Sequence, residues 1–177
     1  MKIFRLCLPL ALLMILSSDF ATAQTESGAI MVGGLLDLDL AFDDDDDAFQ
    51  FILTPRYGKF IADGLAVGGQ LGIVYEKFGD ENTDTDITLG PFTRWYIFGG
   101  DLRMLLDAQM SYIYNRRALP SSSETNHGFQ FFGGPGLSYF LSDNVALDVI
   151  LGYNYRTFGE EAASSNLKLV AGFQIFL

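Results

Sequence analysis

Apolar residues recur at every second position in eight short stretches of the chain, and this alternation limits the fold more than any other feature. In residues 65–75, for example, Leu65, Val67, Leu71 and Ile73 fall on one face, and the other face is small or polar. Successive side chains of a β-strand point to opposite sides, so such a strand separates two different surroundings. Eight strands of this kind predict an all-β fold, an eight-stranded antiparallel up-and-down transmembrane β-barrel.

The predicted strands are joined by tight turns at one end and by polar loops at the other. The strands are 28–42, 48–59, 65–75, 87–98, 102–114, 128–141, 145–156 and 166–177. The turns are 61–64, 99–101 and 142–144, and the loops are 43–47, 76–86, 115–127 and 157–165. An open sheet would leave edge N–H and C=O groups in hydrocarbon, so we expect the first and last strands to pair and close the barrel.

The N-terminus predicts export from the cytoplasm. Lys2 and Arg5 precede an apolar run at 6–16, and a small-x-small cleavage motif follows. This is the pattern of a secretory signal peptide. A retained anchor helix is the alternative, but the run is shorter than the ~20 residues that span a bilayer. We predict a signal peptide at 1–23, a barrel domain at 24–177 and a location in the bacterial outer membrane.

The predicted mature chain is acidic and has no cysteine. Cys7 leaves with the signal, which excludes a disulfide or a cysteine metal site. Without Lys2, Arg5 and Asp19, the 11 basic and 22 acidic residues of the chain become 9 and 21, a net charge of −12. Such a charge disfavours nucleic acid as a partner. Hydrophobic residues make up 49% of the sequence without forming a long mature block, as expected where only alternate residues meet lipid.

Aromatic residues gather near both ends of the predicted strands. One group lies near the turns and the C-terminus: Tyr57, Phe60, Trp95, Phe98, Tyr139 and Phe173. The other lies near the loops: Phe42, Phe49, Phe51, Tyr75, Tyr112, Tyr114, Phe129, Phe131, Tyr153 and Tyr155. Two such groups predict the two aromatic girdles of a membrane barrel. The core of a soluble β-protein, the alternative, does not predict clusters at both strand ends.

A weak repeat runs through the chain, in which a proline is followed five residues later by an aromatic residue, shortly before a tight turn. Its three copies are Pro55 to Phe60, Pro91 to Tyr96, and Pro135 to Phe140. Proline weakens the interior of a sheet. We therefore expect β-bulges near these turns.

Several of these features together resemble a known family. The alternating strands, the signal end Ala21-Thr22-Ala23-Gln24 and the final segment 172–177 are similar to small outer-membrane β-barrel proteins of the OmpA-barrel and OmpX-like kind. The resemblance covers the whole predicted mature chain. It implies a non-enzymatic barrel with an envelope-stabilising, adhesive or narrow-pore role. It also implies outer-membrane lipids as surroundings, and barrel-assembly machinery and periplasmic chaperones as partners in biogenesis. Members usually end in an aromatic residue, whereas this chain ends in Phe176-Leu177.

Charged residues fall on the faces opposite the aliphatic ones, and we predict that they point into the lumen. They are Asp37, Asp39, Arg56, Arg94, Arg103, Asp107, Asp148 and Lys168. An eight-stranded barrel is just wide enough for side chains to fill it, and unpaired buried charges are costly. We therefore expect a structural plug of salt bridges that includes both Asp37 and Lys168. A gated ion path is the alternative.

Acidic residues crowd two of the predicted loops. Residues 43–47 are all aspartate, and the next loop region holds Glu76, Asp80, Glu81, Asp84 and Asp86. Carboxylates are ligands for Ca²⁺ and Mg²⁺, but the run lacks the glycine at position six and the glutamate at position twelve of a calcium loop. We interpret these residues as solvated loops, and we expect no metal and no cofactor.

His127 is the only histidine, and it follows Ser121, Ser122 and Ser123. A lipid-modifying enzyme would need a general base within ~2.6–3.2 Å of the group it activates. No motif of lipase-type barrels is visible, so we interpret His127 as incidental and predict that the protein is not an enzyme.

Glycines are frequent within the predicted strands: Gly33, Gly34, Gly68, Gly69, Gly72, Gly133, Gly134, Gly136 and Gly152. No helix follows any of them, which excludes a phosphate-binding loop. We expect the inward glycines to make room for arginine and aromatic side chains in a narrow lumen.

The leading hypothesis is a small outer-membrane barrel with a plugged polar interior and a structural or surface-interaction role through its outer loops. A narrow channel and a lipid-modifying enzyme are the alternatives. A soluble eight-stranded ligand carrier is disfavoured, because it would be polar outside and apolar inside.

Overall fold

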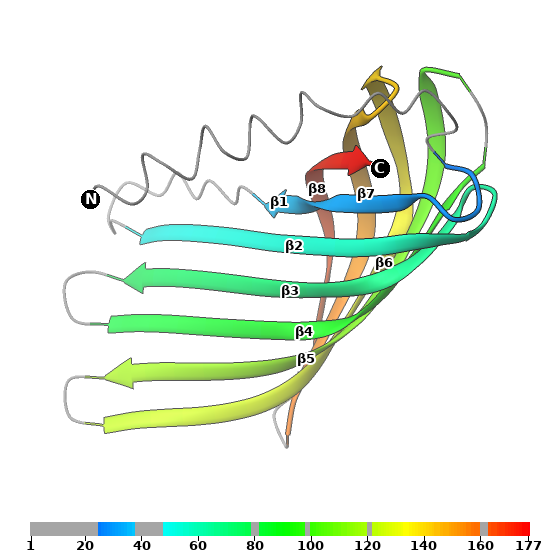
Figure 1. Cartoon of the computed structure of the whole chain (residues 1–177). Coiled ribbons are helices and arrows are strands. Elements are labelled where there is room, and N and C mark those ends of the chain that lie inside the picture. Colours follow the sequence, from blue (N-terminus) through cyan, green and yellow to red (C-terminus); the bar gives the residue numbers. More distant parts are fainter. Residues whose placement is uncertain (1–24, 38–47, 79–81, 98–99, 120–121, 160–162) are drawn as a thin grey trace, which may run out of the picture.

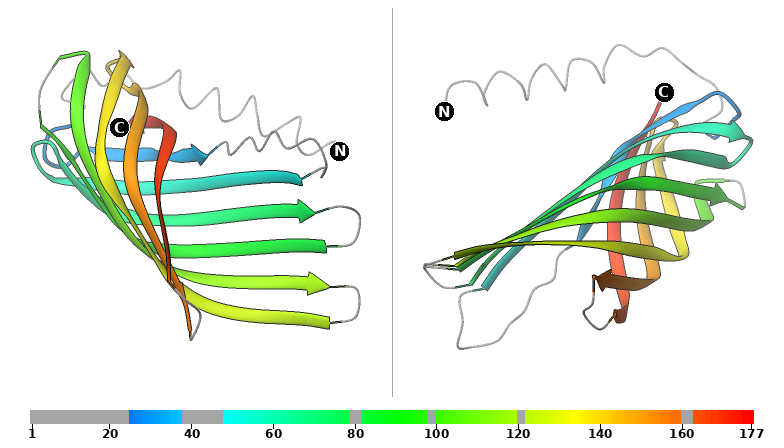
Figure 2. Two further views of the ribbon diagram at one scale, coloured as in Figure 1. Left: turned by 180° about the vertical axis from the view of Figure 1, so that it is seen from behind. Right: turned by 90° about the horizontal axis from the view of Figure 1, so that it is seen from below.

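The protein forms a closed barrel of antiparallel strands (Figures 1 and 2). The computed structural model describes residues 25–37, 48–78, 82–97, 100–119, 122–159 and 163–177. The strands are β1 (Ile30–Asp37), β2 (Ala48–Ala62), β3 (Leu65–Phe78), β4 (Asn82–Tyr96), β5 (Leu102–Leu119), β6 (Ser122–Ser142), β7 (Val145–Phe158) and β8 (Ser164–Phe176). The predicted eight-stranded up-and-down β-barrel is confirmed.

The two ends of the chain close the barrel. Strand β1 pairs with β8 from Met31 opposite Phe176 to Leu36 opposite Ala171. The backbone N–H of Ile30 donates to the carbonyl oxygen of Leu177 at 2.8 Å, and that of Leu177 donates back at 2.9 Å. This pairing leaves no free sheet edge between the two strands, as predicted. The predicted signal peptide lies outside the described residues. In the described part of the chain, no helix is long and apolar enough to cross a membrane.

Alternation sorts the side chains between lipid and lumen. Along β7, buried and exposed residues alternate from Ala146 to Tyr155. Leu71, Leu106 and Leu147 are 40%, 44% and 45% exposed, which confirms their predicted outward direction. The band of exposed aliphatic residues around the barrel is the surface that meets hydrocarbon.

Two predicted loops are mostly strand. In place of the loop at 76–86, β3 continues to Phe78 and β4 begins at Asn82. In place of the loop at 115–127, β5 continues to Leu119 and β6 begins at Ser122. Ladder hydrogen bonds need no apolar face, so a hairpin continues beyond the lipid after the alternation has ended.

The three prolines lie inside β2, β4 and β6 without shifting the register. Beside Pro55, the β2–β3 ladder passes from Leu53 opposite Ile73 to Arg56 opposite Gln70, with the pairs between them missing. On the β1 side, Pro55 still pairs with Gly34. Proline lacks one N–H, so it costs ladder bonds on one side only. The expected bulges are near the turns, where the register shifts at 60–62 and 140–142, and not at the prolines.

Aromatic side chains surround the barrel at two levels. Tyr57, Trp95, Tyr139 and Phe173 are exposed near the turns, and Tyr112, Tyr114, Phe129, Phe131, Tyr153 and Tyr155 are exposed near the loops. Phe60 was wrongly assigned to this outer set. Alternation along β2 turns it into the lumen, where it is buried. Phe42 and Phe98 lie outside the described residues, and the structure does not describe the side chains of Phe49, Phe51 and Tyr75.

Candidate functional site in the barrel interior

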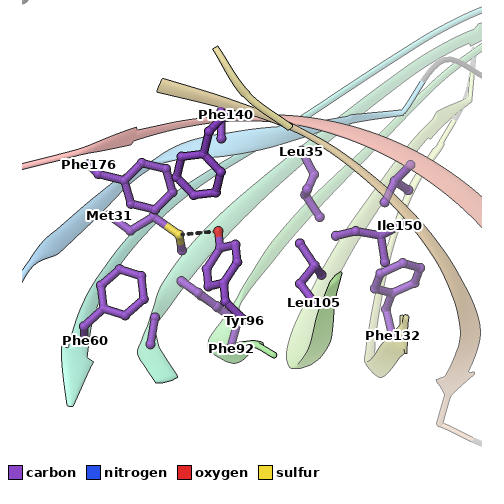
Figure 3. Close-up of a cluster of buried hydrophobic side chains, with 13 residues drawn as sticks. Met31, Leu35, Phe60, Phe92, Tyr96, Leu105, Phe132, Phe140, Ile150 and Phe176 are labelled. Carbon is purple, nitrogen blue, oxygen red and sulfur yellow. Dashed lines mark hydrogen bonds between the residues drawn. The ribbon is translucent and has the colours of Figure 1, made fainter. Parts of the chain in front are cut away.

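An aromatic layer fills the lumen at the turn end, defined as the end where β2 is followed by β3, β4 by β5, and β6 by β7. Its members are Phe60, Tyr96, Phe140 and Phe176, one from each even-numbered strand (Figure 3). Ring centroids of Phe60 and Tyr96 are 6.0 Å apart, and those of Phe140 and Phe176 are 5.2 Å apart. The Tyr96 hydroxyl donates to Met31 Sδ at 3.8 Å. These contacts join strands that are not neighbours in the sheet, across the lumen.

The proline repeat explains how this layer assembles. Each proline is exposed on the outer face, and the aromatic residue five positions later lies on the opposite face. An odd separation along a strand changes the face, which brings the three rings of the repeat into the lumen. Phe176 follows exposed Ala171 by the same spacing on β8.

An ionic layer lies next to the aromatic layer, toward the loops. Arg56 Nη1 is 2.9 Å from Asp107 Oδ2, and Arg94 Nε is 2.8 Å from the same oxygen. Arg94 Nη1 is 2.5 Å from Asp148 Oδ2. All four side chains are fully buried. The order Arg56–Asp107–Arg94–Asp148 alternates in sign and links β2, β5, β4 and β7 across the lumen.

Polar and aromatic neighbours hold the two arginines further. Arg56 Nη2 donates to Gln109 Oε1, and the Arg56 guanidinium lies 4.9 Å from the ring centre of Phe92. Arg94 Nη1 donates to the Tyr96 hydroxyl at 3.4 Å. The layer carries two positive and two negative charges, which offset one another where water is excluded.

Four of the eight predicted lumen charges thus meet in one layer, and two others, Arg103 and Lys168, do not join it. Arg103 lies at the turn end, where Nη1 donates to Thr25 Oγ1 at 2.8 Å and the guanidinium is 4.2 Å from the ring centre of Phe140. It is the second residue of β5, too close to the end of the barrel to reach the layer. Lys168 lines a cavity nearer the loops. The side chain of Asp37 is not described and Asp39 lies outside the described residues, so coupling of Asp37 with Lys168 stays a prediction.

Two phenyl rings occupy spaces that lumen glycines leave. A Cβ on Gly68 would come within 2.8 Å of the Phe92 ring, and a Cβ on Gly152 would overlap the Phe132 ring. With Leu35, Ile150 and Val170, these rings add apolar surface around the ionic layer. Figure 3 shows Leu35, Ile150 and Phe132 as a group apart from the aromatic layer.

Gly152→Ala should destabilise the barrel by about 1–3 kcal/mol, because the added methyl group overpacks the lumen against Phe132. Gly69 is the matched control, since it faces outward with nothing within 4 Å of an added Cβ. Gly69→Ala should leave stability unchanged or slightly higher. Urea unfolding of both variants in lipid vesicles measures the difference, and equal stabilities would contradict the packing argument.

A cavity of about 400 Å³ occupies the lumen between the ionic layer and the loops. Its wall carries a chain of amides, in which Gln130 Nε2 donates to Asn154 Oδ1 at 2.7 Å and Asn154 Nδ2 donates to Asn166 Oδ1 at 2.9 Å. Beside it, Arg156 Nη2 is 2.5 Å from Asp86 Oδ2. We name this space the outer vestibule.

One predicted acidic loop residue is not in a solvated loop: Asp86 lies in β4, where alternation turns it into the lumen, and it is buried and paired with Arg156. The remaining predicted sites are separate from the lumen or undescribed. Residues 43–47, Asp80 and Glu81 lie outside the described residues, as does Ser121, and the side chains of Glu76, Asp84, Ser122 and Ser123 are not described. Among the described residues, no group of three or more His, Cys, Asp and Glu is placed to hold a metal ion. His127 is exposed, and its Nδ1 lies 2.7 Å from the Tyr112 hydroxyl, with the two rings stacked at 5.8 Å. These contacts make it part of the outer aromatic girdle.

Sequence reasoning missed the aromatic layer and the outer vestibule. It expected aromatic side chains in the lumen but did not say which ones, whereas the structure shows that Tyr96, Phe140 and Phe176 point inward together with Met31. Three of the four rings belong to the proline repeat. Because five residues along a strand change the face, an outward proline predicts an inward ring, and this would have identified those three. The vestibule had no comparable signal, because its lining comes from all eight strands.

Comparison with known proteins agrees with this architecture. Residues 8–175 match the model of the outer membrane protein beta-barrel domain family. No curated protein matches the chain. The N-terminal barrel domain of Pseudomonas aeruginosa OprF is similar in fold, with a TM-score of 0.54, 13% identity, and coverage of 85% of this chain and 98% of that one.

Two further solved structures share the fold. The Yersinia pestis attachment invasion locus protein Ail has a TM-score of 0.53 and 12% identity, covering 86% of this chain and 99% of that one. Neisserial surface protein A has a TM-score of 0.52 and 17% identity, and the match covers 83% of this chain and 95% of that one. The sequence match, the closed barrel and its lipid-facing surface lead to one conclusion: the chain belongs to the outer membrane protein beta-barrel family and is a protein of the bacterial outer membrane.

Proposed function

We propose that the protein is a sealed outer-membrane barrel, without enzymatic activity, that acts in the envelope as a structural or surface-interacting element. The observation that carries the proposal is the ionic layer, whose four fully buried side chains link β2, β4, β5 and β7 across the lumen. Moving ions through this layer would require separating charges away from water, which is costly. The aromatic layer beneath it adds a second barrier.

Conductance tests the seal against the alternative of a narrow channel. Purified barrel inserted in a planar lipid bilayer should give no steady single-channel openings, with a porin of known conductance as the positive control. Regular openings from every inserted molecule would contradict the sealed lumen and favour the channel.

The surface role rests on the hairpin of β5 and β6. Its ladder continues beyond the girdle pair Tyr114–His127, from Asn115 opposite Asn126 to Leu119 opposite Ser122. Beyond the lipid, the paired strands of this hairpin extend the barrel wall, which suits contact with other molecules at the cell surface. The contact between His127 and Tyr112 places this histidine in the aromatic girdle. A role in the girdle accounts for His127 without a lipid-modifying reaction, which disfavours the enzyme alternative.

Cysteine labelling tests which end faces the outside. The predicted mature chain has no cysteine of its own. Thr125→Cys, exposed on the β5–β6 hairpin, should react with a membrane-impermeant maleimide on intact cells. Asp101→Cys, exposed in the β4–β5 turn, should react only after the outer membrane is permeabilised. The reverse pattern would contradict the proposed orientation and the surface role of the hairpin.

A further inference from the structure

The outer vestibule has the size of a site for a small molecule. Its volume of about 400 Å³ falls within the ~300–1,000 Å³ of typical ligand pockets. Gln70, Gln109 and Phe132 form its inner end next to the ionic layer, since Gln109 accepts a hydrogen bond from Arg56. Its lining reaches Ser164 and Ser165 at the loop end of β8. The barrel wall thus surrounds this pocket, and the ionic layer bounds it toward the turn end.

The wall of the vestibule is suited to hydroxyl groups. The amides of Gln130, Asn154 and Asn166 form a hydrogen-bonded chain along β6, β7 and β8, and Thr54 and Thr88 add hydroxyl groups from β2 and β4. Each amide both donates and accepts, as does each hydroxyl group of a sugar. Amides that are held in a chain therefore present both N–H donors and C=O acceptors to neighbouring hydroxyl groups of a ligand.

Two buried polar atoms of lining residues have no hydrogen-bond partner among the described residues. Gln70 is 4% exposed, its Nε2 donates to Ser111 Oγ at 2.9 Å, and its Oε1 has no hydrogen-bond partner among the described residues. Arg156 Nε is also buried without a partner in the described part of the chain. Buried polar groups in proteins are nearly always hydrogen-bonded, so these atoms mark places where a bound molecule would be held.

The charge of the vestibule favours an acidic ligand. The described lining residues include two cations, Arg156 and Lys168, and the carboxylate of Asp86 beside the lining pairs with Nη2 of Arg156. Asp86 and the Phe158 ring, whose centre is 5.4 Å from the guanidinium, fix the orientation of Arg156. A guanidinium that is fixed in this way matches the planar carboxylate group. Phe132 and Val170 offer apolar contact for the C–H face of a sugar ring.

We propose that the outer vestibule binds sugar acids of monosaccharide size, with the carboxylate near Arg156 and Lys168 and the ring hydroxyls on the amide wall. The ligand class follows from the combination of fixed cations, paired amides and an apolar inner end. This site is independent of the sealed lumen, because it lies on the loop side of the ionic layer.

Binding is tested by NMR on the ¹⁵N-labelled full barrel in lipid nanodiscs, titrated with glucuronate and, separately, with glucose. Glucuronate should give saturable shifts at Gln70, Asn154 and Arg156, and glucose should bind at least tenfold more weakly. Arg156→Gln and Lys168→Met should each weaken glucuronate binding about tenfold. The matched controls Arg116→Gln and Lys59→Met, which change exposed residues outside the lining, should leave binding unchanged.

Each other result would overturn the proposal. Absence of saturable shifts with both sugars would remove the site. Equal binding of glucose and glucuronate would remove the role of the cations. Glucuronate binding that survives in both Arg156→Gln and Lys168→Met would assign the site to another part of the molecule. If Arg156→Gln fails to fold, Lys168→Met against Lys59→Met still decides the outcome.

Discussion

Replacing Arg94 with leucine should destabilise the barrel by about 3–5 kcal/mol, the usual cost of removing one partner from a buried ion pair. Arg94 binds Asp107 and Asp148 at the centre of the ionic layer. Asp107 would keep Arg56, but Asp148 would lose the cation that it pairs with in the described structure. The loss should appear as a lower temperature for the heat-dependent change in gel mobility and as a lower urea midpoint.

A double variant separates charge from packing. In the Arg94→Leu background, Asp148→Asn removes the stranded charge and should recover part of the lost stability, so the two changes should not be additive. Arg103→Leu is the matched control, because this arginine is half-buried at the turn end rather than in the layer. Additive losses in the double variant, or an equal loss in the control, would show that the ionic layer does not act as a unit.

Replacing Leu71 with arginine should cost about 2–4 kcal/mol, the penalty for a cation on the lipid face near the middle of the bilayer. Leu71 is exposed, it pairs with Leu89, and Ile73 lies two positions along on the same face. An arginine there would be surrounded by hydrocarbon. The free energy of unfolding in lipid vesicles and the yield of folded barrel in cells both measure the effect.

Depth in the membrane provides the control for this prediction. Leu141 is 55% exposed at the turn end of β6, where a longer side chain reaches the interface. Arginine near the interface costs only about 0–1 kcal/mol. Equal losses from Leu71→Arg and Leu141→Arg would contradict the assignment of the aliphatic band to the bilayer core.

Residue alternation was enough to predict the strands, their faces and their surroundings. Alternation is a local property with a period of two, so the outward direction of Leu71 and the inward direction of Arg94 could be read from neighbours alone. The even strand number and the apolar outer face required closure between the first and last strands. The strand ends beyond the lipid were less predictable. Hairpins such as β5–β6 continue there without an apolar face, so the sequence shows no alternation that would mark the strands.

Which lumen residues meet could not be predicted, because it depends on how the strands are arranged in three dimensions. Arg94 and Asp148 come from β4 and β7, and Phe60 and Phe176 from β2 and β8, so their contacts depend on strand stagger and on heights across the lumen. Alternation gives the face of a residue but not its level, which is why Arg103 and Lys168 were grouped with charges that lie at other levels. The outer vestibule likewise exists only once all eight strands enclose it, because its polar wall is built from residues far apart in the chain.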